Sequence, residues 1–420
     1  MTILIKNAHI LSPDSSHHNS KKDILIENGV ITKIGARIKS EKAKVINSKN
    51  LHVSAGWMDI GPLCGEPGYE HRETLSSMTK VAAAGGYTAI APFPNTNPVI
   101  DNKSTIQYIL NTTQDHIVDY HPIGAISKNT AGEEITEMID MHHCGAVAYS
   151  DGNQPVHTNG LMLRALQYAK GTDSLIIHTP DDPTISNGNN IHEGEVSTSL
   201  GLKASPVLSE VMTLERDLKL REYSDSKLLS YNISSEESTD RVSQKKEKKH
   251  TTSVSYLNLC LTDEAIAHFD VNAKVSPPLR SETDRQALIK GISSNKIDII
   301  TSNHQPVEED LKKKEFTYAK AGAIGLQTVF SGIVTHASKI SVNKIVAAIA
   351  LNPRKVLNID IPKVEEGAKA NLTIFDPSLE WRLDETTNAS MSKNSPFWNQ
   401  SLMGKVIGVI NGKLSHINKY

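Results

Sequence analysis

Three side chains far apart in the chain have the chemistry to bind a metal ion or to transfer a proton. They are Asp151, His178 and His304, and each follows a short apolar run rich in strand-forming residues. Carboxylate oxygens and imidazole nitrogens are common zinc ligands, and both groups also act as general acids and bases. Such a set could support metal-assisted hydrolysis. A lone aspartate or histidine is also common as a hydrogen-bonded core residue, so the residue types alone leave both interpretations open.

Strand-like and helix-like segments alternate between about residues 56 and 355, which predicts βαβ units around a parallel sheet. About eight such units over some 300 residues is the size of a (β/α)₈ barrel. In that fold the active site lies at the C-terminal ends of the strands. The strand candidates are YTAIAPF, DYHPIGAI, GAVAYSD, SLIIHTP, KLLSYNIS, TTSVSYLNL and KIDIITSN, and the helix candidates include SSMTKVAAAGG, GLMLRALQYAK, SPVLSEVMTLERDLKLREY and TDRQALIKGI.

Both ends of the chain read as strands. Residues 1–55 contain ILIKNAHIL and DILIENGVITKIG, with an Asn28-Gly29 hairpin signal, and residues 356–420 contain ANLTIFDP and GKVIGVINGKLSHI, with a second signal at Asn411-Gly412. Chain ends often lie close together in a folded domain. We therefore predict one small β-sandwich domain built from residues 1–55 and 356–420, beside a barrel of residues 56–355.

The composition of this chain of 420 residues narrows the functional classes. A net charge of −2 argues against a nucleic-acid partner, and no apolar run is long enough for a membrane span, which argues against a membrane partner. The N-terminus lacks the pattern of a signal peptide. The three cysteines, Cys64, Cys144 and Cys260, are widely spaced and odd in number, which indicates a reducing compartment. We expect a cytoplasmic protein.

The segment from Asp59 to Asp101 resembles the first strand, loop and second strand of the dihydroorotase family, within the amidohydrolase superfamily. Asp59, the Glu66-Pro67-Gly68 motif and the Pro94-Asn95-Thr96 turn match the family pattern. Segments such as LNPRKVL and NSPFWNQSLMGKVIGVINGK extend the resemblance over nearly the whole chain. The resemblance implies the same fold class, an amidohydrolase-type (β/α)₈ barrel with a small β-domain.

The chain departs from the family at the positions that do the chemistry. At the family's two histidine positions this sequence has Gly61 and Leu63, and at the arginine position it has Gly65. Asn232 stands in place of a further histidine, and Asn303 in place of the final aspartate. By the same resemblance, Asp151 and His178 are the surviving metal-ligand positions, and Asn95 is the surviving substrate-binding position. Two ligands rarely hold zinc, and the amide of Asn303 is not a base. The resemblance therefore implies a degenerate site with no catalytic residue and no bound cofactor.

These observations favour a non-catalytic dihydroorotase-like protein of pyrimidine biosynthesis, that is, a pseudoenzyme. Some inactive members of the family support the assembly of aspartate transcarbamoylase, so the resemblance implies that partner, or self-association into a homo-oligomer. The alternative is an active dihydroorotase, interconverting carbamoyl aspartate and dihydroorotate, with zinc held by a rearranged site. The histidines available for it are His71, His157, His192 and His304. A basic run, Lys245 to Lys249, is expected to be a solvated helix end.

Overall fold

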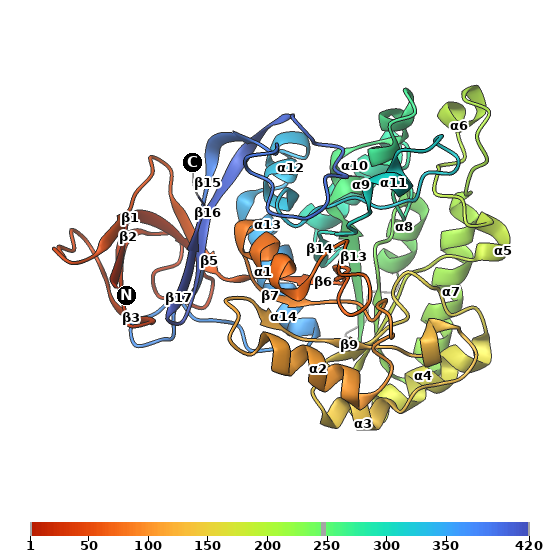
Figure 1. The fold of residues 1–420 in the computed structure, drawn as a ribbon, viewed down its shortest axis with the longest axis horizontal. Helices are drawn as coiled ribbons and strands as arrows, with labels where there is room; N and C mark the ends of the chain where they lie inside the picture. Colours follow the sequence, from red (N-terminus) through yellow and green to blue (C-terminus); the bar gives the residue numbers. More distant parts are fainter. Residues whose placement is uncertain (1, 245–248, 419–420) are drawn as a thin grey trace.

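The computed structural model describes residues 2–244 and 249–418 and has two parts, a sheet at one side of the molecule and a barrel at the other (Figure 1). Of the predicted basic run, Lys245 to Lys248 lie outside the described residues. Lys249 is described, and its ammonium pairs with Asp225 at 2.7 Å. Among the described residues, none of the helices is long and apolar enough to cross a membrane.

The sheet contains strands from both ends of the chain, and β5 joins the two sets. β5 pairs in parallel with β1 on one side and antiparallel with β15 on the other, so that His52 lies opposite both His9 and Phe375. The strand order is β17-β16-β15-β5-β1-β2-β3, with β4 also paired to β1. The strands are β1 (Thr2–Leu11), β2 (Lys21–Glu27), β3 (Val30–Gly35), β4 (Lys44–Ile46), β5 (His52–Ala55), β15 (Asn371–Arg382), β16 (Ser401–Asn411) and β17 (Leu414–Ile417).

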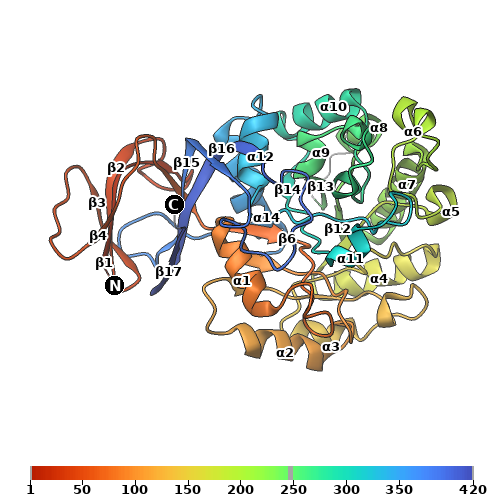
Figure 2. The ribbon, with the colours of Figure 1, turned by 45° about the horizontal axis from the view of Figure 1, so that its top comes forward.

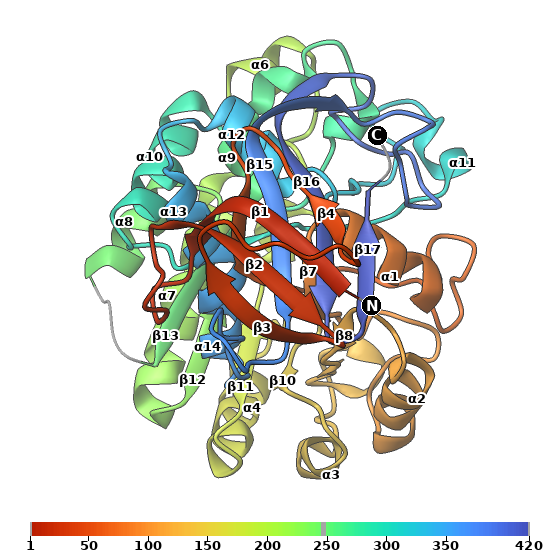
Figure 3. The ribbon, with the colours of Figure 1, turned by 90° about the vertical axis from the view of Figure 1, so that its left-hand side faces the viewer.

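This sheet folds over its own apolar core. Figure 3 shows β1, β2 and β3 crossing in front of β15 and β16. Between these layers, isoleucines of the N-terminal strands pack against Leu372, Ile374 and Ile410 in one buried cluster. Burial of such side chains typically contributes about 1.5–3 kcal/mol each. The alternation of apolar and polar residues that predicts these strands therefore also holds the two layers together, because it places the apolar side chains between them.

Both predicted hairpins form, but only one turns at the Asn-Gly pair. Asn28 and Gly29 have positive φ angles of 51° and 84° between β2 and β3, as a type I′ turn requires. In the second hairpin Asn411 pairs with Leu414, so the turn residues are Gly412 and Lys413. Asn411 stays in the strand because its side-chain amide donates to the carbonyl of Ile117, outside the sheet, at 3.0 Å.

The barrel strands are parallel and form two arcs. One arc has the order β14-β13-β12-β11-β10-β9 and the other β6-β7-β8. The segment DYHPIGAI, predicted as one strand, is two short strands, because Pro122 has no N–H to continue the ladder. The barrel strands are β6 (Trp57–Ile60), β7 (Tyr87–Ala91), β8 (Asp119–Tyr120), β9 (Ile123–Gly124), β10 (Ala148–Tyr149), β11 (Leu175–His178), β12 (Lys227–Ser230), β13 (His250–Ser255) and β14 (Ile299–Thr301).

Helices surround these strands, with α2, α3, α4, α7, α8 and α10 in the outer layer (Figure 2). The segment TTSVSYLNL, predicted as a strand throughout, becomes helix α9 after Ser255, whose hydroxyl accepts the N–H of Leu257 and caps the helix. The helices are α1 (Leu75–Ala84), α2 (Lys103–Thr113), α3 (Met138–His143), α4 (Asn159–Gly171), α5 (Pro183–Ser186), α6 (Glu195–Ser199), α7 (Val207–Ser224), α8 (Glu236–Gln244), α9 (Tyr256–Cys260), α10 (Glu282–Ser293), α11 (Glu309–Lys312), α12 (Val329–His336), α13 (Val342–Val346) and α14 (Asn352–Val356), with short 3₁₀ turns η1 (Lys128–Thr130), η2 (Asp263–Ile266) and η3 (Val271–Ala273) and one π-helical turn η4 (Ala347–Leu351).

Candidate active site at the barrel mouth

An aromatic pair occupies the C-terminal end of the barrel. Tyr231 follows β12, is 3% exposed, and meets the edge of the Phe93 ring with a centroid distance of 4.8 Å. Its hydroxyl donates to the carbonyl of Ile60 at 3.1 Å. Both rings belong to the cluster of apolar side chains that fills the barrel interior. The place where site residues would converge is therefore packed with apolar side chains.

Gly61 and Leu63 follow β6 directly beneath this pair. A Cβ atom on Gly61 would lie 2.4 Å from the Tyr231 hydroxyl and 2.7 Å from Phe93, and the φ angle of Gly61 is +83°. Leu63 packs against the barrel-interior cluster and donates its backbone N–H to the carbonyl of His304 at 2.9 Å. Any side chain at position 61 would displace the tyrosine, so the glycine is a packing requirement of this arrangement.

Gly65 is enclosed by backbone. A Cβ atom there would lie 2.1 Å from the carbonyl oxygen of Tyr69 and 2.6 Å from that of Glu73. Real Cβ atoms do not approach oxygen so closely, and backbone carbonyls cannot move aside like a flexible side chain. The loop has a conformation that excludes an arginine at this position.

The carboxylate of Asp59 ties β6 to the segment after β14. It accepts hydrogen bonds from the backbone N–H of Ser302 at 2.9 Å and from the Ser302 hydroxyl at 2.5 Å. Burial raises the pKa of Asp59 to about 7, although these hydrogen bonds oppose the rise. Asp59 thus has a structural role between the two arcs of the barrel.

Asp151 follows β10 and is 2% exposed. One carboxylate oxygen accepts the backbone N–H groups of Ile126 and Ser127 at 2.8 and 2.9 Å, and the other accepts the Ser127 hydroxyl. Burial raises its pKa, while the bonds to Ser127 and Ile126 act in the opposite direction. A carboxylate offers about four acceptor positions, and the protein fills three of them here.

His178, at the end of β11, has no lone pair left for a metal. Its Nε2 accepts the backbone N–H of Val156 at 2.9 Å, so Nδ1 carries the proton and donates it to Asp217 at 2.6 Å. Asp217 in turn accepts a hydrogen bond from the guanidinium of Arg216 at 2.7 Å. A neutral imidazole has one acceptor nitrogen, and a backbone group holds it in place here.

The asparagine after β12, Asn232, lies in the left-handed region at φ +56°, a conformation that asparagine tolerates better than most residues. Its carbonyl oxygen accepts the hydroxyl of Thr301 at 2.7 Å. Within the described residues its Nδ2 is buried without a hydrogen-bond partner.

The asparagine after β14, Asn303, is also left-handed, with φ +46°. It donates to the carbonyl of Ser276 at 2.9 Å and accepts from the Gln305 amide at 2.9 Å. Its amide therefore crosslinks loops above the barrel, and both of its polar atoms are engaged.

Asn95, the predicted substrate-binding residue, packs against the loop that holds Asp151. Its amide donates to the backbone carbonyl of Asp151 at 3.0 Å, and a Cβ on Gly152 would lie 1.8 Å from its side-chain oxygen. The side chain is partly buried. The structure therefore brings Asn95 and Asp151 together.

The four histidines considered as replacements do not gather at one point. His71 is exposed and lies 3.9 Å from Glu308, while His192 lies 3.4 Å from Arg280. His304 is fully buried, and its Nδ1 accepts the backbone N–H of Gly325 at 3.1 Å. His157 is exposed. Within residues 2–244 and 249–418, no three His, Cys, Asp or Glu side chains come together in a way that could hold a metal ion.

The amidohydrolase fold implies one or two divalent ions, and the residues at this barrel mouth do not fit them. The acceptor nitrogen of His178 is taken, Asp151 has about one acceptor position left, and no group of three His, Cys, Asp or Glu side chains forms among the described residues. No hydrolytic step can be derived through a metal in this arrangement.

Comparison with known proteins relates this barrel to a family. A model of the family described as Dihydro-orotase-like matches residues 53–238, and a model of the Amidohydrolase family matches residues 228–414. The chain is 37% identical over 419 residues to a dihydroorotase of Acetivibrio thermocellus, covering 98% of each chain, and 36% identical to one of Syntrophus aciditrophicus, covering 97% of each.

The chain belongs to the dihydroorotase family. Among solved structures it is similar to an L-hydantoinase (dihydropyrimidinase) from Arthrobacter aurescens, with a TM-score of 0.85, 21% identity and coverage of 99% of this chain and 96% of that one. It is also similar to a dihydropyrimidinase from Brevibacillus agri, with a TM-score of 0.82, 18% identity and coverage of 100% and 95%. At these identities the likeness concerns the fold. The predicted fold class, an amidohydrolase-type barrel with a small β-domain, is confirmed.

Three residues that shape the mouth of this dihydroorotase-family barrel were not singled out by the sequence reasoning: Tyr231, Phe93 and Ser302. The signal for Tyr231 was present, because it directly precedes Asn232 at the end of a strand where the family site lies. A bulky aromatic residue beside a position that departs from the family pattern indicates that the space is filled.

Proposed function

We propose that this member of the dihydroorotase family is non-catalytic. The observation that carries the proposal is that the acceptor nitrogen of His178 is occupied by the backbone N–H of Val156. The family's remaining ligand position, Asp151, accepts three protein donors and is a single ligand, whereas zinc sites usually have at least three protein ligands. Without a metal ion to lower it, the pKa of water stays far above neutral, and the amide of Asn303 supplies no base.

The test is a paired measurement on this protein and the dihydroorotase of Acetivibrio thermocellus, purified and assayed identically. We expect well under one zinc ion per chain after dialysis and no conversion of carbamoyl aspartate or dihydroorotate above background, with or without added zinc. Asn303→Asp should not restore turnover. Chelator-sensitive turnover by the unmodified chain would overturn the proposal and favour the active alternative with a rearranged zinc site.

We further propose a partner role, with aspartate transcarbamoylase as the partner, as the family resemblance implies. The outer face of α7 supports a contact surface, because Leu208, Met212 and Tyr223 are exposed there and share one side of the helix. Exposed apolar patches commonly mark interaction sites.

This partner role is testable by light scattering after size-exclusion chromatography. We expect the protein to co-elute with the aspartate transcarbamoylase encoded by the same genome, and Met212→Lys to abolish co-elution. An unchanged elution of the mixture would reject this partner, and a homodimer sensitive to the same substitution would assign the face to self-association.

A further inference from the structure

A cavity of about 670 Å³ lies outside the barrel mouth, beside α11. Its walls come from four separate segments: His71 after β6, Val271 and Asn272 in η3, residues 307–314 around α11, and residues 385–398. The volume is in the range of small-molecule sites, about 300–1,000 Å³. Asp151 and His178 do not line it, and of the residues described at the barrel mouth only the exposed His71 and its neighbour Glu308 do.

A buried lysine lines this cavity. Lys312 is 5% exposed, and its Nζ donates to the carbonyl of Val271 at 2.7 Å. Among the described residues no carboxylate lies within ion-pair distance of it. An ammonium has three donors, and burial of a cation without a counter-charge is costly. Accordingly, burial lowers the pKa of Lys312 to about 8; the carboxylate of Asp270 opposes this shift, and the ammonium of Lys274 adds to it.

The carboxylates that line the cavity are already paired with other cations. These pairs are Glu308 with Arg72 at 2.7 Å, Glu309 with Lys313 at 2.5 Å, and Glu385 with Lys393 at 2.7 Å. Lys314 also lines the cavity and has no carboxylate partner among the described residues. The walls therefore offer positive charge and N–H donors that the protein itself does not neutralise.

The remaining walls are apolar. Val271, Val307, Met391 and Trp398 contribute them, and the indole of Trp398 is partly exposed. An indole presents a flat face on which another flat ring can stack, as well as an N–H donor. A ligand that matched these walls would combine an anionic group with a flat apolar body.

Lys312 also makes a structural contact. Its bond to Val271 and the bonds of Lys274 to the carbonyls of Phe316 and Thr317, at 3.0 and 2.9 Å, fasten the segment after β14 to η3. This fastening uses one of the three N–H groups of Lys312. It does not explain why a buried lysine lines a cavity whose carboxylates are paired with other cations.

We propose that the cavity beside α11 is a binding site for a small organic anion with an aromatic body, with Lys312 holding the anionic group and Trp398 the ring. The site is independent of whether the barrel mouth is catalytic. It gives this member of the dihydroorotase family a means of sensing a metabolite outside the family's usual site.

The probe is the fluorescent aromatic sulfonate 8-anilinonaphthalene-1-sulfonate, with uncharged N-phenyl-1-naphthylamine as its matched neutral analogue. We expect one sulfonate bound per chain, energy transfer from tryptophan, and much weaker binding of the neutral analogue. Lys312→Met keeps the length of the side chain and removes the charge, and it should weaken the sulfonate about ten-fold or more, as loss of a charged hydrogen bond predicts.

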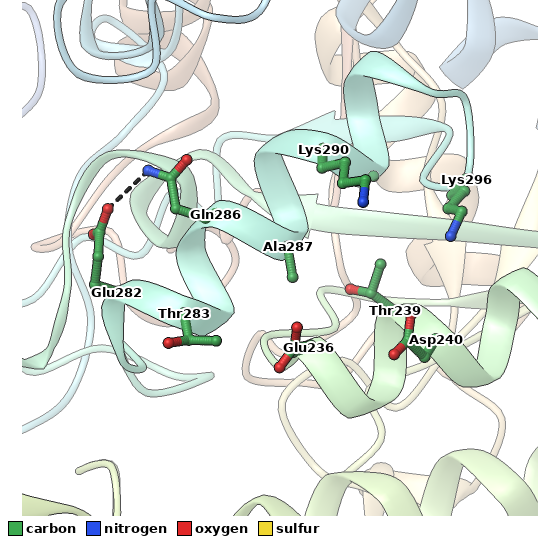
Figure 4. A pocket seen from close by; sticks show the side chains of 10 residues that line it. Glu236, Thr239, Asp240, Glu282, Thr283, Gln286, Ala287, Lys290 and Lys296 are labelled. Atoms are coloured by element: carbon green, nitrogen blue, oxygen red, sulfur yellow. Dashed lines mark hydrogen bonds between the residues drawn. The ribbon is translucent and has the colours of Figure 1, made fainter.

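The control variant is Lys290→Met. Lys290 lines another hollow, of about 400 Å³, between α8 and α10, where Figure 4 shows it near Lys296 with Glu236 and Asp240 below. The affinity of the Lys290→Met variant for the sulfonate should equal that of the unmodified protein. Met391→Glu is the second test, because Met391 is 51% exposed and tolerates a polar side chain, yet a carboxylate there should repel the probe from the cavity.

Competition identifies the anionic group. Displacement of the probe by benzoate but not phenyl phosphate assigns a carboxylate ligand, and the reverse assigns a phosphate ester; inorganic phosphate should not compete at the same concentration. Affinity within two-fold of the unmodified protein in both Lys312→Met and Met391→Glu, or equal binding of the neutral analogue, would overturn the proposal.

Discussion

Replacing Asp59 with asparagine should remove a large part of the pH dependence of folding stability. The Asp59 carboxyl is fully buried, and its two oxygens accept the N–H and hydroxyl of Ser302. Burial raises its pKa from 3.8 to about 7. Asparagine has the same shape as the protonated acid and stays neutral at every pH, so the substitution isolates the cost of ionising this group.

The magnitude follows from linkage. The raised pKa means that the folded state binds a proton that the unfolded state has lost, so the stabilisation is full below pH ~4 and is lost as pH rises to ~7. The shift of roughly three units corresponds to about 4 kcal/mol at about 1.36 kcal/mol per unit. Between pH 5 and 8 the unmodified protein should lose ~3 kcal/mol of unfolding free energy through Asp59 alone.

The assay is urea denaturation followed by circular dichroism at several pH values from 5 to 8. Burial also raises the pKa of Asp151 and Asp263, so the unmodified protein carries other contributions in this window, and the difference from Asp59→Asn is the quantity to compare. The surface substitution Asp240→Asn serves as the control. If Asp59→Asn keeps the pH slope of the unmodified protein, the argument from burial is refuted.

Three further experiments test the packing of the barrel mouth. Gly61→Ala should destabilise the protein by about 2–5 kcal/mol in urea denaturation, from overpacking against Tyr231 and a positive φ, and Tyr231→Leu should recover part of that loss. His178→Ala should lower the unfolding free energy by about 2–4 kcal/mol, because it strips a partner from buried Asp217, and should leave the zinc content unchanged; a fall in zinc would mark a ligand. A variant that carries all the family residues should bind no zinc by elemental analysis and should have a lower melting temperature than the unmodified protein. Its substitutions are Gly61→His, Leu63→His, Gly65→Arg, Asn232→His and Asn303→Asp.

Much of the fold follows from local patterns in the sequence. The helix 207–224 and the strand 175–178 lie where apolar periodicity predicts them, because burial of an apolar face decides both. The ends of elements were harder to predict. Pro122 splits one predicted strand and the Ser255 cap ends another, since a single missing donor or one side-chain hydrogen bond outweighs β propensity at a strand end.

The candidate site could be predicted only in part from the sequence. The sequence identifies Gly61, Gly65 and Asn303 as departures from a family pattern, but it does not reveal what replaces the lost groups. That depends on contacts between distant segments, such as Tyr231 over Gly61 or the carbonyl of Tyr69 beside Gly65. The cavity beside Lys312 was equally hidden, because its walls come from segments more than 300 residues apart in the chain.

The residues that depart from the family pattern make specific contacts at the barrel mouth, although the buried Nδ2 of Asn232 has no hydrogen-bond partner among the described residues. Gly61 leaves room for the Tyr231 ring, and the amide of Asn303 bridges two partners. These contacts stabilise a closed barrel mouth, which is what the proposed non-catalytic role requires of this part of the molecule.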